Sequence, residues 1–244
     1  MQPLILKFGS SVLANASALP LVADDIVRAA ADGRGVVAVV SAFAGVTDGL
    51  IRRAESVGGA VDPYAYAALV GSGELESASM LALTLAAGGR PARLLTPEQF
   101  TLRARGNPLD AEPHDFDREQ LARALDETGI AIVPGFIAHD DRNRTLLLGR
   151  GGSDYTALFL AARLNGRCRL VKDVDGLYER DPAVPGPAPS RYRSVEWSEA
   201  LRVAGKLVQP KTIRFAESLG LQFEVGCIGG DDGTLVGPGP VQLY

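Results

Sequence analysis

The sequence predicts an α/β fold, in which helices cover a β-sheet. Short apolar runs typical of strands alternate with helical patterns from one end of the chain to the other, and this alternation is characteristic of α/β proteins. The run Val-Val-Ala-Val-Val at 36–40 is apolar throughout, which predicts a strand buried on both faces. A glycine-rich turn at 149–152 joins a strand-like segment to a helical one.

In the first half of the chain, cap and turn signals mark where the expected helices begin and end. A helix over 74–87 is stopped by Gly88-Gly89, because glycine readily ends helices. Asp117 begins another helix, with Gln120 three residues on as in a capping box. The other elements expected in this half are helices over 21–31 and 47–57 and strands over 4–8, 36–40, 92–95 and 130–133.

The second half continues the alternation around a proline-rich segment. Four prolines fall within 181–190, and proline lacks the N–H that a central strand or helix needs, so this segment predicts an extended surface loop. A glycine-rich segment at 229–239 closes the chain. The expected elements are strands over 145–148, 169–171 and 222–227 and helices over 154–165, 194–204 and 210–219.

Composition and charge describe an ordinary globular protein. The 244 residues are 46% hydrophobic and 22% charged, which is enough apolar sequence to bury a core and too much for a disordered chain. A net charge of −4 and a pI near 5.3 argue against a nucleic-acid-binding protein. Neither a secretory signal nor an apolar run of membrane-spanning length is visible. We therefore expect a cytoplasmic protein with no nucleic-acid and no membrane partner.

The segment 148–157, Leu-Gly-Arg-Gly-Gly-Ser-Asp-Tyr-Thr-Ala, carries the clearest functional signal. Its glycines expose backbone N–H groups at the start of a helix, whose dipole places partial positive charge there. Such a turn suits an anion, and Arg150 and Asp154 add charges that suit a polar acidic substrate beside a phosphate. The alternative is a tight strand-to-helix turn that binds nothing.

Short motifs follow one another along nearly the whole chain. They begin with Lys7-Phe8-Gly9-Ser10-Ser11 and continue at 39–48, 73–77, 134–137, 149–156, 172–178, 181–182, 205–206 with Pro210, and 233–236. In their order and spacing they resemble the amino acid kinase family and, within it, the aspartate kinases.

The resemblance implies an α/β/α sandwich with a mainly parallel central sheet. It implies a single kinase domain over 1–240, with a substrate-side lobe to about 135 and a nucleotide-side lobe from about 136. The implied reaction uses ATP and Mg²⁺ to phosphorylate the side-chain carboxylate of L-aspartate to 4-phospho-L-aspartate. A homodimer is expected from the family. Because the chain stops soon after the last kinase motif, we expect no ACT regulatory domain, and a separate regulatory chain is a further possibility.

Two motifs depart from the aspartate kinase pattern and keep other functions open. A single glycine followed by Ser10 and Ser11 stands where the family usually has a glycine pair, and Gln209 stands where aspartate kinases often have histidine. The first alternative is a kinase of the same fold that acts on another small acid, such as glutamate or a phosphonate. The second is a non-catalytic member that binds anions or regulates a larger kinase.

Phosphoryl transfer to a carboxylate brings two anions together, so it requires positive charge around the transferring group. Lys7, at the end of the first strand, and Lys206, in a glycine-flanked turn, are predicted to clamp the β- and γ-phosphates. Asp154 is predicted to orient the lysines and contact the substrate ammonium; the alternative for it is a helix cap. These three residues, Lys7, Asp154 and Lys206, are the predicted catalytic set.

The remaining substrate residues come from three motifs. Arg150 is suited to a bidentate grip on an α-carboxylate, although a surface arginine is the alternative. Glu74 matches the family's Gly-Glu segment, which implies a contact with the substrate ammonium; otherwise it complements a helix dipole. Ser41, at the end of the second expected strand, is placed near the phosphate or the substrate, and Ser77 is expected on a helix surface. The turn residues Gly152 and Ser153 complete the predicted substrate-binding set.

The nucleotide is expected between the first strand and the motif at 172–178. Asp173 is suited to the ribose or to the metal's outer ligands, and Tyr178 to packing on adenine, with loop scaffolding as the alternative for both. Mg²⁺ prefers phosphate oxygens and water, and the sequence has no clustered metal-ligand motif, so no fixed protein metal site is expected. The predicted nucleotide-binding residues are Lys7, Gly9, Ser10, Lys172, Asp173, Tyr178 and Lys206.

Overall fold

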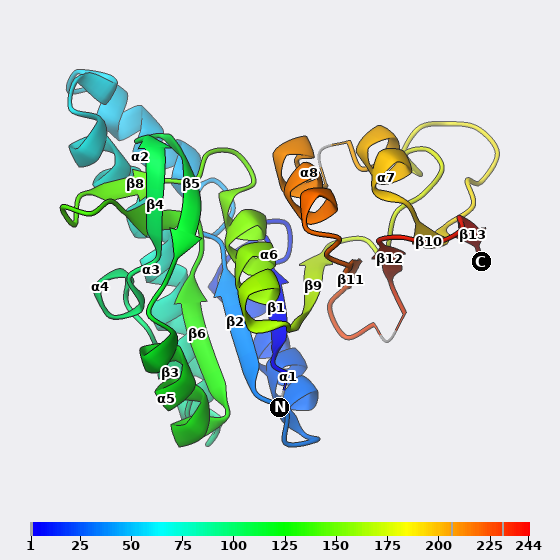
Figure 1. The fold of residues 1–244 in the computed structure, drawn as a ribbon, viewed down its shortest axis with the longest axis horizontal. Coiled ribbons are helices and arrows are strands. Elements are labelled where there is room, and N and C mark those ends of the chain that lie inside the picture. Colours follow the sequence, from blue (N-terminus) through cyan, green and yellow to red (C-terminus); the bar gives the residue numbers. More distant parts are fainter. Residues whose placement is uncertain (1, 206, 231) are drawn as a thin grey trace.

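The computed structural model describes residues 2–205, 207–230 and 232–244. It confirms the predicted α/β fold, built on a nine-stranded sheet that crosses the middle of the molecule (Figure 1). Pairing is parallel except between β11 and β12 and between β10 and β13. The strands lie in the order β13 (Gln242–Leu243), β10 (Tyr192–Val195), β12 (Thr234–Val236), β11 (Phe223–Cys227), β9 (Arg167–Lys172), β1 (Leu4–Phe8), β2 (Val36–Val40), β6 (Ile130–Pro134) and β3 (Arg93–Leu94).

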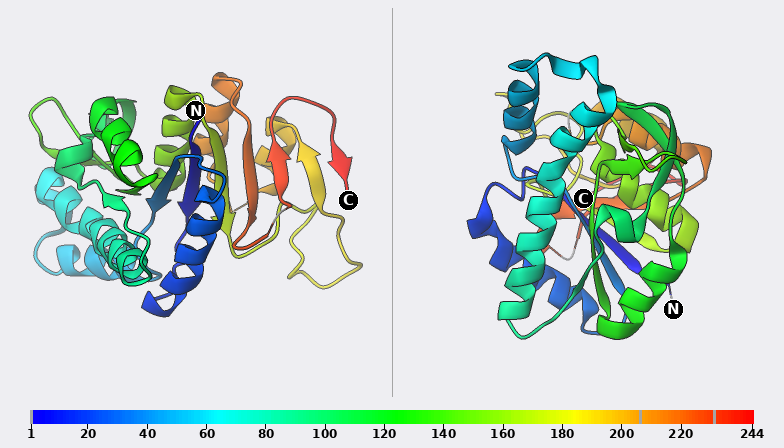
Figure 2. Two further views of the ribbon diagram at one scale, coloured as in Figure 1. Left: turned by 90° about the horizontal axis from the view of Figure 1, so that it is seen from below. Right: turned by 90° about the vertical axis from the view of Figure 1, so that its left-hand side faces the viewer.

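Helices cover both faces of this sheet (Figures 1 and 2). On one face the core contains residues of α5 (Arg118–Thr128), α6 (Gly152–Leu164), α7 (Trp197–Val203) and α8 (Pro210–Ser218). On the other it contains residues of α1 (Leu19–Ala30) and α3 (Pro63–Ala87). Successive residues of a strand point to opposite faces, so in β1 Ile5 joins the first core and Leu6 and Phe8 join the second.

A second, four-stranded sheet lies beside the amino-terminal half of α3. Its strands are β5 (Asp110–Asp115), β4 (Arg103–Asn107), β7 (Ile137–His139) and β8 (Thr145–Leu147). Sequence reasoning predicted β8 and missed the other three strands, because β4 and β5 are rich in polar residues and β7 has only three residues. The helices α2 (Val46–Glu55) and α4 (Pro97–Phe100) complete the α-helices of the described chain.

The long helix α3 begins eleven residues earlier than the predicted start at 74, at Pro63. Asp62 caps it by accepting hydrogen bonds from the N–H groups of Tyr64 and Ala65. Gly71 and Gly73 weaken the helical signal in this stretch, since glycine is a poor helix former. Both are required by close packing: a Cβ at either position would lie 2.9 Å from a neighbouring side chain.

The segment predicted as one helix over 194–204 is a strand followed by a helix. Ser194 and Val195 end β10, where they pair with β12, and α7 begins at Trp197. The glycine-rich closing segment also contains a strand, β12, which sequence reasoning did not predict. No helix among the described residues is long and apolar enough to cross a membrane.

Candidate active site

The carboxyl ends of four neighbouring parallel strands meet at one edge of the large sheet. Phe8 of β1 lies beside Val40 of β2, which lies beside Pro134 of β6, and β9 pairs with the other side of β1. In open α/β sheets, ligands bind at this edge. Lys7, Ser41 and Lys172 all lie at or next to these strand ends.

Lys7 and Lys172 both form an ion pair with Asp154. The Lys7 Nζ lies 2.7 Å from Oδ1 of Asp154, and the Lys172 Nζ lies 2.8 Å from Oδ2. All three residues are buried, with exposures of 5%, 6% and 3% for Lys7, Lys172 and Asp154. Lys7 follows Ile5 on the face covered by α6, and Asp154 lies in the first turn of α6, so strand alternation explains why the two side chains meet. We call these three residues the lysine–aspartate cluster.

The cluster carries more positive than negative charge in a buried place. Burial lowers the pKa of Lys7 to about 8, with the attraction of Asp154 opposing this and the repulsion of Lys172 adding to it. For Asp154, burial alone acts to raise the pKa, but the two ammonium groups outweigh it and the pKa is lowered. The Asp154 carboxylate is therefore ionised, and it is shared between the two ammonium groups.

Gly9 leaves room beside the ammonium of Lys7. A Cβ on this buried residue would lie 3.1 Å from the Lys7 Nζ, so a larger residue would press on the lysine. Gly9 therefore lies beside the cluster, and Ser10 lies exposed in the turn that follows. Their binding of the nucleotide stays a prediction.

Glu74 presents a buried carboxyl group near the cluster. The residue is 3% exposed, and its Oε2 has no hydrogen-bond partner. Burial raises the pKa of Glu74 to about 8, although hydrogen bonds from the backbone, first that of Ala42, and the charge of Lys7 act in the other direction. A buried carboxyl oxygen without a hydrogen-bond partner is costly, and a donor or cation bound at Oε2 would relieve that cost.

Ser77 was predicted on the helix surface, and this prediction is wrong. Ser77 is fully buried, and its hydroxyl donates hydrogen bonds to the carbonyls of Ser41, at 2.7 Å, and of Glu74, at 3.0 Å. The Ser41 N–H in turn donates to the carbonyl of Phe8. Ser77 thereby ties α3, which carries Glu74, to the ends of β1 and β2.

The glycine-rich turn before α6 adopts the conformation its sequence predicts. Gly149 and Gly151 have positive φ angles of 74°, and α6 begins at Gly152. Gly152 and Ser153 are buried at the helix start next to Asp154. Arg150 is exposed on this turn, so its predicted grip on a substrate carboxylate stays a prediction.

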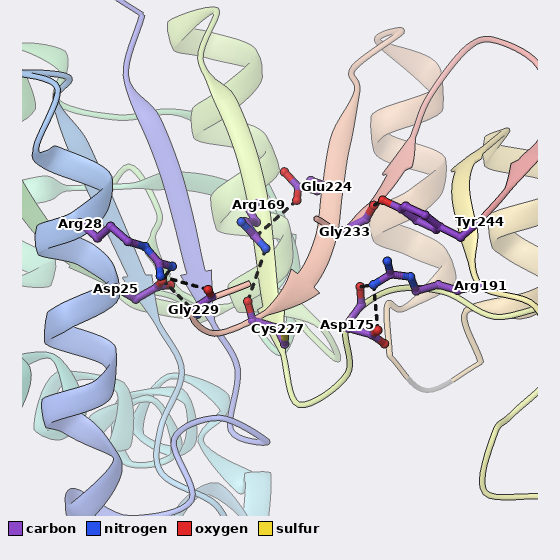
Figure 3. Close-up of polar contacts among 10 residues, drawn as sticks. All are labelled: Asp25, Arg28, Arg169, Asp175, Arg191, Glu224, Cys227, Gly229, Gly233 and Tyr244. Atoms are coloured by element: carbon purple, nitrogen blue, oxygen red, sulfur yellow. Dashed lines mark hydrogen bonds and ion pairs between the residues drawn. The ribbon is translucent and has the colours of Figure 1, made fainter. Parts of the chain in front are cut away.

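The predicted nucleotide residues after β9 are held by their own network. The Tyr178 hydroxyl donates to Asp175 at 2.8 Å, and Asp175 accepts from Arg191 at 2.8 Å. The guanidinium of Arg191 also stacks over the ring of Tyr244, 4.0 Å from its centroid; Figure 3 shows Arg191 directed at Asp175. Asp173 is exposed. Lys206, predicted as the second phosphate clamp, lies outside the described residues.

A model of the amino acid kinase family matches residues 2–220. The chain belongs to the amino acid kinase family. The resemblance seen in the motifs is thereby confirmed at the family level.

Members of this family that are similar along nearly the whole chain include several aspartokinases. Aspartokinase from Mycolicibacterium smegmatis is 32% identical over 231 residues, covering 92% of this chain and 54% of that protein. Aspartokinase from Corynebacterium glutamicum is 32% identical over 242 residues, covering 97% of this chain and 57% of that protein. The chain thus spans a little over half the length of these curated relatives.

Among solved structures, E. coli aspartokinase III in complex with aspartate and ADP has the same fold. It superimposes with a TM-score of 0.82 at 26% sequence identity, covering 98% of this chain and 65% of that one. This similarity confirms the predicted amino acid kinase sandwich with its mainly parallel sheet.

Sequence reasoning on this family member missed several contacts between distant parts of the chain. It predicted Lys172 and Asp154 separately and did not pair them, although alternation along β9 places Lys172 on the same face as Leu170, toward α6. It also missed Lys211, whose Nζ donates to Asp110 and to the carbonyl of Leu148 beside the glycine-rich turn. No local signal marks that contact, because Lys211 and Asp110 lie 101 residues apart.

Proposed function

We propose that the chain transfers the γ-phosphoryl group of ATP to the side-chain carboxylate of L-aspartate. A carboxylate oxygen attacks the γ-phosphorus, the bond from that phosphorus to the β–γ bridging oxygen breaks, and ADP leaves. The products are 4-phospho-L-aspartate and ADP. The observation that carries this proposal is the lysine–aspartate cluster with the unpaired Oε2 of Glu74 nearby.

The surplus positive charge of the cluster supports a polyphosphate ligand. Two buried ammonium groups share one carboxylate, and an approaching phosphate would supply the negative charge that they lack. Preorganised cations act most strongly on developing charge in a water-excluded site. We assign Lys7 to the phosphates of ATP and keep Lys206 in the same role on the strength of the motif match.

The acceptor is an amino acid because Glu74 is suited to an ammonium group. An ammonium at its free Oε2 would pair with the ionised carboxylate, offsetting the burial that now favours the neutral acid. Ser41, Gly152 and Ser153 border the same edge of the sheet, and Arg150 on the turn is available for the α-carboxylate. The similarity to aspartokinases supports aspartate among amino acids that carry a second carboxylate.

Mg²⁺ enters with the nucleotide in this proposal. The described residues contain no group of three or more metal-ligating side chains, and both oxygens of Asp154 are engaged by lysines. The ion would take its ligands from phosphate oxygens and water, which suits its hard-cation chemistry. Bound there, it would neutralise phosphate charge; Gly9, Ser10, Asp173 and Tyr178 are the proposed neighbours of the nucleotide.

The test is a panel of acids incubated with Mg-ATP, with ADP release and hydroxylamine trapping of the acyl phosphate as readouts. L-Aspartate should give both signals, whereas succinate, which lacks the ammonium, should give less than a tenth of the rate. L-Glutamate or a phosphonate outperforming aspartate would overturn the substrate assignment, and no turnover with any acid would overturn the activity.

Lys7→Ala tests directly whether Lys7 binds the phosphates of ATP during transfer. We expect kcat to fall by about 10²-fold or more, as when a transition-state donor is removed. Arg28→Ala is the matched control, because Arg28 is a cation on α1, which covers the face of the sheet opposite to the cluster, and its turnover should stay within about twofold. Equal turnover of Lys7→Ala and wild type would contradict the role of Lys7.

A further inference from the structure

The glycine-rich turn before α6 is packed from two sides by other parts of the chain. Figure 1 shows α6 between β5 and α8. A Cβ on Gly149 would collide with Oδ1 of Asp110, the first residue of β5. A Cβ on Gly151 would lie 2.7 Å from the side chain of Gln209, the N-cap of α8. Glycine at these two positions therefore lets β5 and α8 approach the turn closely.

Lys211, in the first turn of α8, joins these segments. Its Nζ donates hydrogen bonds to Oδ1 of Asp110, to the carbonyl of Ala111 at 3.3 Å and to the carbonyl of Leu148 at 3.2 Å. An ammonium group has three N–H donors, so these acceptors engage all of them. Nζ also lies 5.2 Å from the centre of the Tyr155 ring, in the first turn of α6. The ammonium group is therefore held in one place beside the turn.

Asp110 places a carboxylate against a turn that is proposed to bind an acidic substrate. Backbone N–H groups at the start of a helix favour a bound anion, and Arg150 on this turn is proposed for a substrate carboxylate. The negative charge of Asp110 reaches α6: burial raises the pKa of Tyr155 to about 12, and the charges of Glu112 and Asp110 add to this shift. Without a cation beside it, Asp110 would repel an acidic substrate from the turn.

The ion pair between Lys211 and Asp110 is not needed to hold these segments together. The side chains are 31% and 60% exposed, and pairs of this kind contribute little to stability. β5 is held along its length by pairing with β4, and the hairpin that joins them is fixed to β8, since the carbonyl of Pro108 accepts from the N–H of Leu147 at 2.8 Å. What the pair does change is the charge beside the turn, which Lys211 cancels.

We propose that Lys211 is a positioning residue for the acidic substrate, because it cancels the charge of Asp110 and orients the first peptide group of the turn. This proposal rests on the proposed function for its acidic acceptor but not for phosphoryl transfer. The carbonyl of Leu148 is directed at Lys211. The C=O and N–H of a trans peptide point in opposite directions, so the N–H of Gly149 is directed away from Lys211. A carboxylate at the turn then meets N–H groups and a neutral ion pair.

Binding of L-aspartate and L-glutamate tests this role. Their dissociation constants are measured by calorimetry, with and without Mg-AMP-PNP. We expect Lys211→Met to weaken the binding of L-aspartate by about fivefold or more, because the charge of Asp110 is then uncompensated. Lys211→Arg keeps the positive charge and should bind more tightly than Lys211→Met. Arg214→Met is the matched control, since it removes one positive charge from an exposed position of the same helix, and it should bind as wild type does.

The double variant Asp110→Asn/Lys211→Met separates the effect of charge from that of packing. Removing both charges should restore the affinity that Lys211→Met loses, and Asp110→Asn alone should bind at least as tightly as wild type. A double variant that binds as weakly as Lys211→Met would overturn the proposal. So would a Lys211→Met variant with the affinity of wild type.

The outcomes also distinguish this proposal from the proposed function. If the loss and its restoration are measured for an acid that is bound but never phosphorylated, the role of Lys211 holds and the kinase proposal fails. If Lys211→Met phosphorylates L-aspartate with the KM of wild type, the kinase proposal holds and the role of Lys211 is wrong. A wild type that binds neither acid in either condition overturns the role of Lys211. The unfolding midpoints of the variants should stay near that of wild type, which excludes misfolding as the cause.

Discussion

The two faces of the large sheet both gather charged side chains, but they arrange them differently. On the face covered by α6, Lys7 and Lys172 are buried and share one aspartate. On the face covered by α1, Arg28 pairs with Asp25 and Arg169 with Glu224, so each cation has its own carboxylate. Figure 3 shows these pairs on either side of the turn that carries Gly229.

The difference teaches that unbalanced charge and cavity size select different parts of this molecule as the candidate site. The pairs on the α1 face line a cavity of about 1180 Å³ that contains none of the lysine–aspartate cluster. Much of that charge holds the fold: Arg28 donates to the carbonyl of Gly229, whose N–H donates to Asp25. Ion pairs that are partly exposed contribute little to stability. A buried excess of positive charge is costly unless a bound anion balances it.

The comparison predicts its largest effect for Asp154→Asn. This change leaves two buried ammonium groups without a carboxylate, so we expect the free energy of unfolding to fall by about 3–5 kcal/mol and kcat by about 10³-fold. Denaturant unfolding and the aspartate assay measure the two effects. Asp25→Asn, on the opposite face of the sheet, is the matched control. We expect it to lose under about 2 kcal/mol of stability and to keep turnover near that of wild type; equal losses in the two variants would remove the distinction between the faces.

Glu74→Gln should change how stability depends on pH. The pKa of Glu74 is raised from 4.5 to about 8, so between these values the folded protein holds a proton that the unfolded chain has released. Stability from this group is therefore complete below about pH 4.5 and is lost as pH rises toward 8. The measurement is the unfolding free energy of wild type minus that of Glu74→Gln. This difference should fall by about 1 kcal/mol per pH unit between pH 5 and 7.5. A flat difference would show that Glu74 is ionised in the folded protein.

The smallest effect is expected for the ion pair between Lys211 and Asp110. It lies near the glycine-rich turn at the carboxyl end, but it joins one cation to one anion, and the Asp110 side chain is 60% exposed. Asp110→Asn should cost less than about 1 kcal/mol in thermal or chemical unfolding. Suppose instead that Asp110→Asn loses as much stability as Asp154→Asn. Location at this edge of the sheet, and not a buried excess of charge, would then determine how much a charged group contributes to stability.

Part of the site follows from local patterns. Alternation along β1 places Lys7 on the face that α6 covers, and the glycines at 149–152 predict a tight entry into a helix whose first turn carries Asp154. Ser77 shows where such patterns fail: its position on an apolar helix gives no sign that its hydroxyl reaches Ser41. The true start of α3 was hidden for a related reason, since Gly71 and Gly73 lower helix propensity for the sake of packing.

The sequence by itself determined the α/β architecture, the motifs that identify the family, and the residue types needed for phosphoryl transfer. These follow from periodicity and short motifs, which depend on neighbours along the chain. Only the tertiary structure decided that Lys172 shares Asp154 with Lys7, that Glu74 keeps a buried oxygen without a partner, and that Ser77 joins α3 to β2. The physical reason is that burial and pairing of charge depend on contacts between segments far apart in the chain.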